Sequence, residues 1–324
     1  MRIAFAGLSH WHLGLYLDAA RATGTEVMSV WDANLDASRR LSKEIGIGAS
    51  LSLADLLAQK PDLVVVMGRP DALSTVIPAV FQSGLPMILE KPAVTSTPDL
   101  EPLVERAGGE GLFVAVPLPN RMSPLWPEMA GLAGTGRLGP VSHAHFRIVN
   151  GPPKRYRDDG VPWLLDPAVS GGGALRNLGI HGIDAALTLA DGAGLKVVST
   201  TVNHRLYGEA VEDYAAVTLR SADGMTATIE AGYTFASMAA GGDFEWRVSA
   251  QNAHLLDRGD SCRVATLDDG ALRELTPLPP ARRYTAFFAD TLDRLSRGAP
   301  PAVGIADYWR AMRLIDEAYR HART

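Results

Sequence analysis

Continuous apolar runs alternate with segments of helical periodicity along the first 117 residues. The apolar runs have the length and β-branched content of buried strands, and they occupy residues 2–7, 26–32, 62–67, 86–90 and 111–117. Apolar positions three and four residues apart predict helices between them, over residues 12–24, 35–46, 52–58, 72–84 and 97–109. This alternation predicts a parallel sheet covered by helices on both faces. Such a sheet binds ligands beyond the carboxyl ends of its strands.

The pattern changes near residues 116–121, where VPLPNR interrupts the alternation. Several later segments are strand-like, some with period-two alternation, and turn residues separate them: 141–150, 196–207, 213–221, 225–235 and 243–256. We therefore predict two domains, residues 1–118 and residues 119–324, the second of α+β type.

Composition narrows the class of protein. The 324 residues are 47% hydrophobic and 21% charged, and the net charge is −5 without a basic run, which argues against nucleic acid or an anionic membrane as partner. A single cysteine, Cys262, excludes an intrachain disulfide framework and favours a reducing compartment. No apolar run approaches the roughly 20 residues that span a bilayer. We expect a soluble, cytoplasmic protein.

One predicted helix carries polar residues in an apolar setting. In GGGALRNLGIHGID (residues 171–184), Asn177, His181 and Asp184 stand at positions i, i+4 and i+7, which share one face of an α-helix. A helix that is apolar around most of its circumference is buried, and buried polar groups cost free energy unless they are hydrogen-bonded. A cavity that holds a polyhydroxylated ligand would satisfy all three. A hydrogen-bonded core residue is the alternative for any one of them alone.

The first strand-to-helix turn is Gly7-Leu8-Ser9-His10-Trp11-His12, and it has only the first glycine of the dinucleotide fingerprint G-x-G-x-x-G. Asp32 follows Gly7 by 25 positions, near the spacing of an acid that binds a ribose 2′-hydroxyl, which favours NAD over NADP. Arg39 and Arg40 keep NADP open. We assign the whole turn and Asp32 to the cofactor. The two histidines contact a phosphate, line the active site, or are solvated loop residues.

Glu90-Lys91-Pro92 ends the fifth predicted strand, where it would be an ordinary surface ion pair if it stood alone. It occurs in order with the GLSHWH turn, Asp32 and WLLDPAVSGGGALRNLGIHGID (residues 163–184). Together these motifs resemble the glucose–fructose oxidoreductase, inositol dehydrogenase and rhizopine-catabolism family. The resemblance continues through residues 212–233 and a C-terminal helix from about residue 307, so it spans nearly the whole chain.

This resemblance implies an α/β Rossmann domain and an α+β domain with a large, mostly antiparallel sheet, whose open face joins subunits into a homodimer or homotetramer. It implies NAD-dependent hydride transfer to or from a secondary hydroxyl or ketone of a sugar, cyclitol or sugar derivative. By this resemblance His181 is the general base, and Lys91 hydrogen-bonds the reacting oxygen. Many relatives have aspartate in place of Asn177. Asparagine can orient His181 or bind a substrate hydroxyl, but it cannot accept a proton.

Further site candidates lie in loops. Gly68, Arg69 and Asp71 follow the fourth strand and, with Glu90 and Lys91, are candidates for the cofactor. Substrate candidates besides the helix residues are Asn120, Arg121, Tyr156 and Trp163. His143 and His145 share a strand face, but no third ligand follows at a zinc-like spacing, so we predict no metal site. Two other functions remain: an NAD-using glycosidase of the same fold, and a non-catalytic dinucleotide-binding sensor.

Overall fold

The computed structural model describes residues 1–239 and 241–322. The chain forms two compact units, and neither is a single stretch of sequence. Unit 1 contains Met1–Pro117, Tyr156–Gly171 and Tyr284–Trp309, and unit 2 contains the rest of the described chain. The division into domains at residue 118 stays a prediction, since Rossmann-type residues and later segments share unit 1.

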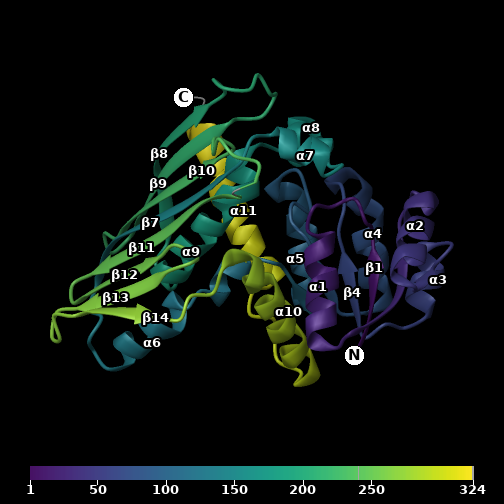
Figure 1. The fold of residues 1–324 in the computed structure, drawn as a ribbon, viewed down its shortest axis with the longest axis horizontal. Helices are drawn as coiled ribbons and strands as arrows, with labels where there is room; N and C mark the ends of the chain where they lie inside the picture. The colour runs from purple at the N-terminus through teal and green to yellow at the C-terminus, as the bar shows by residue number, and fades with distance from the viewer. Residues whose placement is uncertain (240, 323–324) are drawn as a thin grey trace. The chain divides into compact units, whose positions relative to one another are not determined.

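Unit 1 is built on a six-stranded parallel sheet with the order β3-β2-β1-β4-β5-β6 (Figure 1). Its strands are β1 (Arg2–Ala6), β2 (Glu26–Trp31), β3 (Gly48–Ala49), β4 (Leu63–Val66), β5 (Met87–Leu89) and β6 (Val114–Ala115). All four residues of β4 are buried, as are the last four of β1, which explains why these strands are apolar without alternation. The strand order reverses direction between β1 and β4, and such a switch point is where ligands bind.

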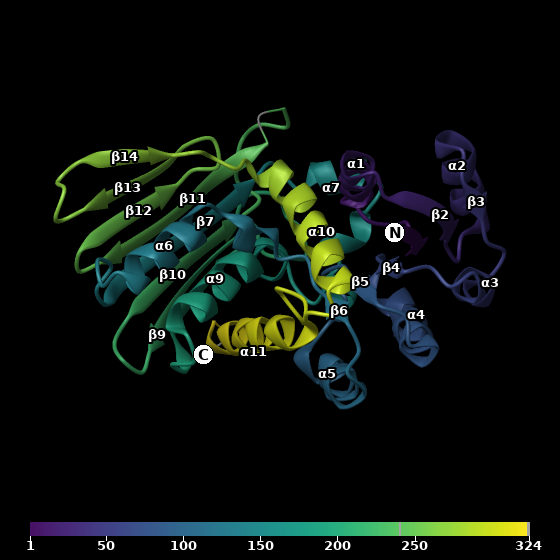
Figure 2. The same ribbon diagram turned by 90° about the horizontal axis from the view of Figure 1, so that it is seen from below.

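Helices join these strands as the periodicity predicts. They are α1 (Leu13–Thr23), α2 (Leu35–Ile45), α3 (Leu53–Ala58), α4 (Pro70–Ser83) and α5 (Thr97–Glu110). The Ser52 side chain accepts a hydrogen bond from the Asp55 N–H at 3.0 Å and so caps α3. Figure 2 shows α1 and α4 on opposite sides of the sheet. A 3₁₀ turn (Pro162–Leu165) and the short helix α8 (Pro167–Ser170) also belong to unit 1.

Unit 2 contains an eight-stranded sheet with the order β14-β13-β12-β11-β7-β10-β9-β8, in which only β7 and β10 pair in parallel. The predicted strand 243–256 is two strands, because residues 251 and 252 form a turn. The strands are β7 (Val141–Asn150), β8 (Leu195–Asn203), β9 (Tyr214–Ser221), β10 (Thr226–Gly232), β11 (Gly242–Ala250), β12 (Ala253–Asp257), β13 (Cys262–Thr266) and β14 (Leu272–Leu275).

The helices α6 (Leu125–Gly134) and α9 (Ile180–Ala190) lie on one face of this sheet (Figure 1). Helix α9 packs closely on β7 and β10, because a Cβ at Gly182 would stand only 3.0 Å from side-chain atoms of Ile229 and Phe146. A 3₁₀ turn (Pro119–Met122) precedes α6, and a π-helical turn (Leu175–Gly179) precedes α9.

Three helices carry the chain from one unit to the other: α7 (Lys154–Asp158), α10 (Pro280–Ser296) and α11 (Ile305–His321). None of the helices in residues 1–239 and 241–322 combines the length and the hydropathy that a membrane crossing requires.

Candidate active site

The β1–α1 turn begins at a glycine that no other residue can replace without movement. Gly7 has a φ of +88°, and a Cβ on it would stand 1.8 Å from the Met67 carbonyl oxygen. Asp32, directly after β2, holds the turn from the other side. Its Oδ2 accepts a hydrogen bond from the Leu8 N–H at 2.7 Å, and its Oδ1 accepts one from the Asn34 N–H at 2.8 Å. Each carboxylate oxygen has a second lone pair for a ligand hydroxyl.

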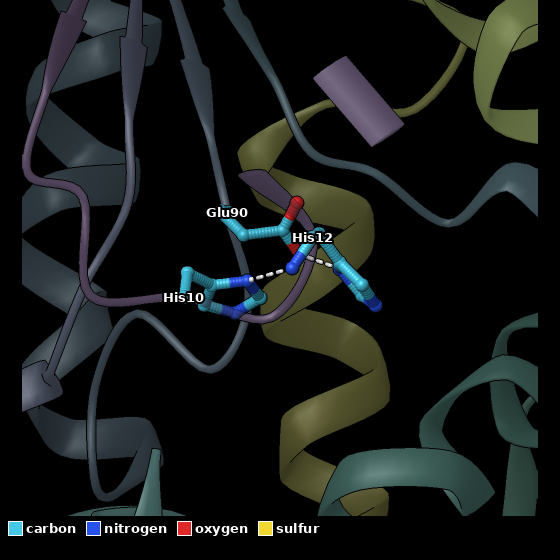
Figure 3. A group of neighbouring side chains, drawn as sticks. All are labelled: His10, His12 and Glu90. Atoms are coloured by element: carbon cyan, nitrogen blue, oxygen red, sulfur yellow. Dashed lines mark hydrogen bonds and ion pairs between the residues drawn. The ribbon is translucent and has the colours of Figure 1, made fainter. Parts of the chain in front are cut away.

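His10 is buried and both of its ring nitrogens have partners. Nε2 lies 3.1 Å from the Lys91 carbonyl oxygen, which can only accept, so Nε2 carries the proton. Nδ1 then accepts a hydrogen bond from the His12 N–H at 3.1 Å (Figure 3). Burial lowers the pKa of His10 to about 3, which agrees with a neutral ring.

Glu90, at the end of β5, is buried among three hydrogen-bond donors. Its Oε2 accepts from the Tyr16 hydroxyl at 2.7 Å, and its Oε1 accepts from the Lys91 N–H at 3.1 Å. His12 Nδ1 lies 3.2 Å from Oε1 (Figure 3) and 2.7 Å from the Tyr284 hydroxyl of α10. Burial raises the pKa of Glu90, whereas the charge of Lys91 and the donated hydrogen bonds oppose that rise. His12 is the third donor in the tautomer that carries its proton on Nδ1, in which the Tyr284 oxygen also accepts from this nitrogen. With His12 in that tautomer, the three donors match an ionised carboxylate.

Lys91 is 2% exposed, and its ammonium lies over the Trp11 ring, 5.4 Å from the ring centroid. Burial lowers the pKa of Lys91 to about 8, and attraction to Glu90 opposes that change. A lysine of this kind gains and loses its proton near neutral pH, as proton-transfer and oxyanion-binding groups do.

The substrate candidates Tyr156 and Trp163 belong to unit 1 and pack against the β1–α1 turn. The Trp11 ring lies 5.8 Å from that of Tyr156 and 5.9 Å from that of Trp163, and it stacks on His10 at 3.8 Å. Both partners are at most 5% exposed. The indole Nε1 of Trp163 has no hydrogen-bond partner among the described residues. The structure thus brings these two rings beside the predicted cofactor turn, and their contact with substrate stays a prediction.

The loop after β4 carries an ion pair. Arg69 donates two hydrogen bonds to Asp71, at 3.0 and 2.8 Å, and both side chains are about half exposed. Gly68 precedes them with a φ of +140°. Asp71 also lines a cavity of about 480 Å³, together with residues of α4, α5 and the segment 93–95. An exposed pair of this kind contributes little to stability, so it is available to a ligand.

In unit 2 the predicted α-helix at residues 171–184 begins differently from expectation. Residues Leu175–Gly179 form a π-helical turn, and the α-helix starts only at Ile180. A Cβ at Gly179 would stand 2.7 Å from the Leu175 side chain, so the glycine leaves room for this wider turn. A π turn changes the helical repeat, so the spacing alone does not place Asn177 and His181 on one face. Single π turns inside helices occur often at functional sites.

Glu212 fixes the start of that turn. Its carboxylate accepts hydrogen bonds from the N–H groups of Gly173 and Leu175 and from the Tyr319 hydroxyl, at 2.9, 2.9 and 2.7 Å. Gly172 and Gly173 admit these neighbours, because a Cβ at Gly172 would stand 2.2 Å from the Tyr319 hydroxyl and one at Gly173 would stand 2.7 Å from the Glu212 carbonyl oxygen. Within unit 2, therefore, the glycines bring the backbone close to the protein's own side chains.

Two of the polar residues of this helix, Asn177 and Asp184, have partners inside unit 2. Asn177 donates a hydrogen bond to the Tyr233 hydroxyl at 3.2 Å. Asp184 accepts two from Arg121, at 2.9 and 2.6 Å. His181 is 7% exposed. These contacts give Asp184 and Arg121 a structural partner in each other, and their contact with substrate stays a prediction.

Asn120 is also tied into the protein. Its side-chain oxygen accepts a hydrogen bond from Arg283 at 2.9 Å, and Arg283 forms a fully buried ion pair with Asp257. Its backbone oxygen accepts from the Trp126 indole at 2.9 Å. The Asn120 side chain therefore holds Arg283 of α10, and its contact with substrate stays a prediction.

Two family models match consecutive parts of the chain. Residues 1–117 match the model described as an oxidoreductase family with an NAD-binding Rossmann fold. Residues 127–255 match the model described as the GFO/IDH/MocA C-terminal domain.

The chain belongs to the GFO/IDH/MocA oxidoreductase family. It is therefore an oxidoreductase with an NAD(P)-binding Rossmann fold. The predicted combination of a parallel Rossmann sheet with a mostly antiparallel second sheet is confirmed.

Individual relatives show the range of the family. The chain is 24% identical over 307 residues to 1,5-anhydro-D-fructose reductase from Ensifer adhaerens. The aligned region is 92% of this chain and 88% of that protein. An oxidoreductase from Agrobacterium radiobacter, solved with NAD⁺, L-tartaric acid and magnesium, has a TM-score of 0.85 at 17% identity and covers 100% and 96% of the two chains. Aldose–aldose oxidoreductase from Caulobacter crescentus, solved with glycerol, has a TM-score of 0.81 at 21% identity and covers 100% and 97%.

The residues of unit 1 suit the dinucleotide of this family even though two fingerprint glycines are replaced. Gly14, in the first turn of α1, is exposed, and nothing lies within 4 Å of where its Cβ would stand. The helix N-terminus there is open to a phosphate, which helix N–H groups and the helix dipole attract. Asp32 lies beside the same turn and can bind a ribose hydroxyl.

The histidines of the turn are poor metal ligands. His10, His12 and Glu90 place possible ligand atoms within 4.8 Å of one another. Both nitrogens of His10 already have hydrogen-bond partners, and Lys91 adds a positive charge beside the group. His145, on the sheet of unit 2, lies 3.2 Å from a Glu230 carboxylate oxygen and 3.9 Å from one of Glu245.

Sequence reasoning missed residues that support the site from far along the chain. Tyr16 and Tyr284 contact the Glu90–His12 pair, while Glu212, Tyr233 and Tyr319 contact the π turn and its glycines. Glu212 and Tyr233 lie at the two ends of a segment that carries the family resemblance. Tyr16 gave no signal, because a tyrosine on the inner face of a helix is ordinary core.

Replacing Asp32 with alanine is expected to weaken NAD binding by about tenfold, since it removes a charge-assisted hydrogen bond to the ribose and releases the Leu8 N–H. Calorimetric titration with NAD and with NADP measures the change. Asp36→Ala, on the exposed side of α2, is the matched control. Tighter NADP than NAD binding by the unaltered protein would refute the role given to Asp32.

Proposed function

We propose that the protein is an NAD-dependent dehydrogenase or reductase. It acts on a secondary hydroxyl or ketone of a sugar, cyclitol or sugar derivative. Relatives that act on anhydrofructose and on aldoses support the substrate class.

One observation carries the proposal. At the carboxyl end of β5, where a doubly wound sheet presents its ligands, a buried lysine has a pKa of about 8 and an acidic neighbour. Lys91 supports hydrogen bonding to the reacting oxygen, because its ammonium can stabilise negative charge that develops there. A lysine that served only as a surface charge would stay in water, because burial of its ammonium costs free energy.

His181 is proposed as the general base that takes the hydroxyl proton during oxidation and returns it during reduction. The nicotinamide accepts or supplies the hydride when it is bound. Asn177, whose amide nitrogen donates to Tyr233, is proposed to bind a substrate hydroxyl through its side-chain amide. As an amide it cannot replace His181 in proton transfer.

The test is a screen of sugars, cyclitols and their keto derivatives with the purified protein and NAD or NADH, followed by nicotinamide absorbance. Substrate-dependent reduction or oxidation supports the proposal. A sugar cleaved without net change in NAD would support the glycosidase instead. NAD binding without either reaction across the screen would favour a sensor.

We also propose that copies of the chain associate through the outer face of the second sheet. This face lies opposite α9, and its side chains form a continuous set of ion pairs. Glu230 of β10 contacts His145 at 3.2 Å and Arg147 at 3.1 Å, and Glu245 of β11 contacts Arg258 at 2.8 Å. Charged groups on such a face can meet complementary charges of a second copy and fix its register.

Sedimentation velocity is expected to show a dimer or tetramer. Glu230→Arg is expected to shift the protein toward monomer, because it places a positive charge beside Arg147. Glu101→Arg, on the exposed surface of α5, makes the same charge change away from the sheet and should not alter the mass. A monomeric unaltered protein would refute this interface.

A further inference from the structure

Three consecutive residues of the β1–α1 turn each contact a different part of the Glu90-Lys91 pair. His10 donates a hydrogen bond to the Lys91 carbonyl oxygen at 3.1 Å. The Trp11 ring lies under the Lys91 ammonium at 5.4 Å. His12 contacts the Glu90 carboxylate at 3.2 Å. In sequence the two segments are about 80 residues apart, and the turn is where the family fingerprint has glycines.

The contacts reinforce one another. Trp11 stacks on His10 at 3.8 Å with an angle of 20° between the rings. The hydrogen bond from His10 to the Lys91 backbone therefore also orients the Trp11 ring, which contacts the Lys91 ammonium. His12 Nδ1 is in addition 2.7 Å from the Tyr284 hydroxyl, and Tyr16 donates to Glu90 from α1. Glu90 is thereby fixed from three directions.

This arrangement has an electrostatic consequence. The titratable groups of unit 1 that enter this arrangement with Lys91 are Glu90 directly after β5, His10 and His12 on the turn, Tyr16 on α1 and Tyr284 on α10. Burial keeps both histidines neutral and both tyrosines protonated. Glu90 is the one group among them that can carry a negative charge. Hydrogen bonds from His12 and Tyr16 favour that charged form.

Resting on the proposed function, we propose that His10-Trp11-His12 is a clamp on the catalytic lysine. In this clamp His12 and Tyr16 hold Glu90 as the carboxylate that keeps the Lys91 ammonium charged, and Trp11 orients that ammonium through its ring. These residues act through Lys91 and are positioning residues. The clamp gives His12, which stands where the general dinucleotide fingerprint has its third glycine, a role of its own: its imidazole faces Glu90.

The test measures the titration of Lys91 without requiring turnover. The chain has five lysines, so protein labelled with ¹³C at lysine Cε gives five signals, and Lys91→Arg assigns the one of interest. In the unaltered protein this signal is expected to titrate at about 8. The other four lysines are exposed and give the ordinary lysine titration as an internal reference, while thermal melting reports whether each variant is folded.

Four variants separate the clamp from general packing. Glu90→Gln removes the carboxylate and is expected to lower the pKa of Lys91 by about 1 to 3 pH units. His12→Phe keeps a ring but loses the Nδ1 donor, and Trp11→Leu keeps an apolar side chain but loses the π-face. Both are expected to lower the Lys91 pKa. His12→Asn restores a donor near the Nδ1 position and should return it toward 8. His204→Ala, in an exposed loop, is the matched control.

Kinetics give a second measurement once a substrate is known. The kcat/KM of the unaltered protein is expected to fall as pH rises through about 8, because the ammonium is then lost. In His12→Phe this fall should begin at lower pH. An unchanged Lys91 titration in both Glu90→Gln and His12→Phe would overturn the clamp. Loss of NAD affinity in His12→Phe with that unchanged titration would instead make His12 a cofactor ligand.

The two proposals can fail separately. If no substrate turns over but the Lys91 signal responds as stated, the proposed function fails, and the turn still sets the charge of Lys91. If turnover is found and the signal does not respond, the function stands and the clamp is wrong.

Discussion

Lys91→Ala and His181→Ala are each expected to lower kcat by about 100- to 10,000-fold while the protein stays folded and binds NAD. The reason is that each variant removes a group proposed to handle the reacting oxygen, one as hydrogen-bond donor and one as base. Calorimetric NAD titration measures the cofactor affinity of each variant, and steady-state kinetics with the best substrate of the screen measure its kcat.

The controls for these variants are a lysine and a histidine of the surface. Lys43→Ala and His204→Ala remove the same side chains from exposed positions and should leave kcat unaltered. Unaltered turnover in both Lys91→Ala and His181→Ala would remove the basis for the mechanism. Loss of NAD binding in Lys91→Ala would show that the lysine acts first on the cofactor.

The second large effect is expected at Gly7. Gly7→Ala would place a methyl group 1.8 Å from the Met67 carbonyl oxygen and hold an alanine at a φ of +88°. The left-handed conformation costs about 1–2 kcal/mol, and forced overpacking adds about 1–3 kcal/mol, so the thermal midpoint should fall and NAD binding should be lost. The oxygen belongs to the backbone after β4, so it cannot move aside without disturbing the sheet.

A second glycine isolates the steric part of that effect. Gly24, after α1, has a φ of +64°, but nothing lies within 4 Å of where its Cβ would stand. Gly24→Ala therefore carries only the backbone cost of about 1–2 kcal/mol, and NAD binding should survive. Equal destabilisation by the two variants would mean that the β1–α1 turn relaxes around the methyl group.

The α/β alternation, the second sheet and the Glu90-Lys91 pair could be predicted from the sequence, because each depends on local patterns. Residues 63–66 are apolar without alternation because both faces of β4 are buried. A run of apolar residues in the sequence therefore predicts a strand of this kind. The position of Lys91 follows from the same logic, because it comes directly after a buried strand of a parallel sheet.

The partners of the site residues could not be predicted, because they come from distant positions. His12 was open to three interpretations, and the structure pairs it with Glu90, 78 residues away. The triple glycine was expected to approach a ligand or to turn sharply, and within unit 2 it meets Tyr319 near the C-terminus. The π turn was missed because positions i, i+4 and i+7 fit an ordinary α-helix equally well.

Unit 1 is assembled from chain segments that are made at very different times. The Val116 N–H bonds the Val303 carbonyl oxygen, the Tyr308 hydroxyl accepts from the Ala93 N–H, and Tyr284 contacts His12 across 272 residues. Contacts of such long sequence separation form slowly, because a large loop must close first. During synthesis, the surroundings of Glu90 are therefore complete only after the segment 284–309 has been made.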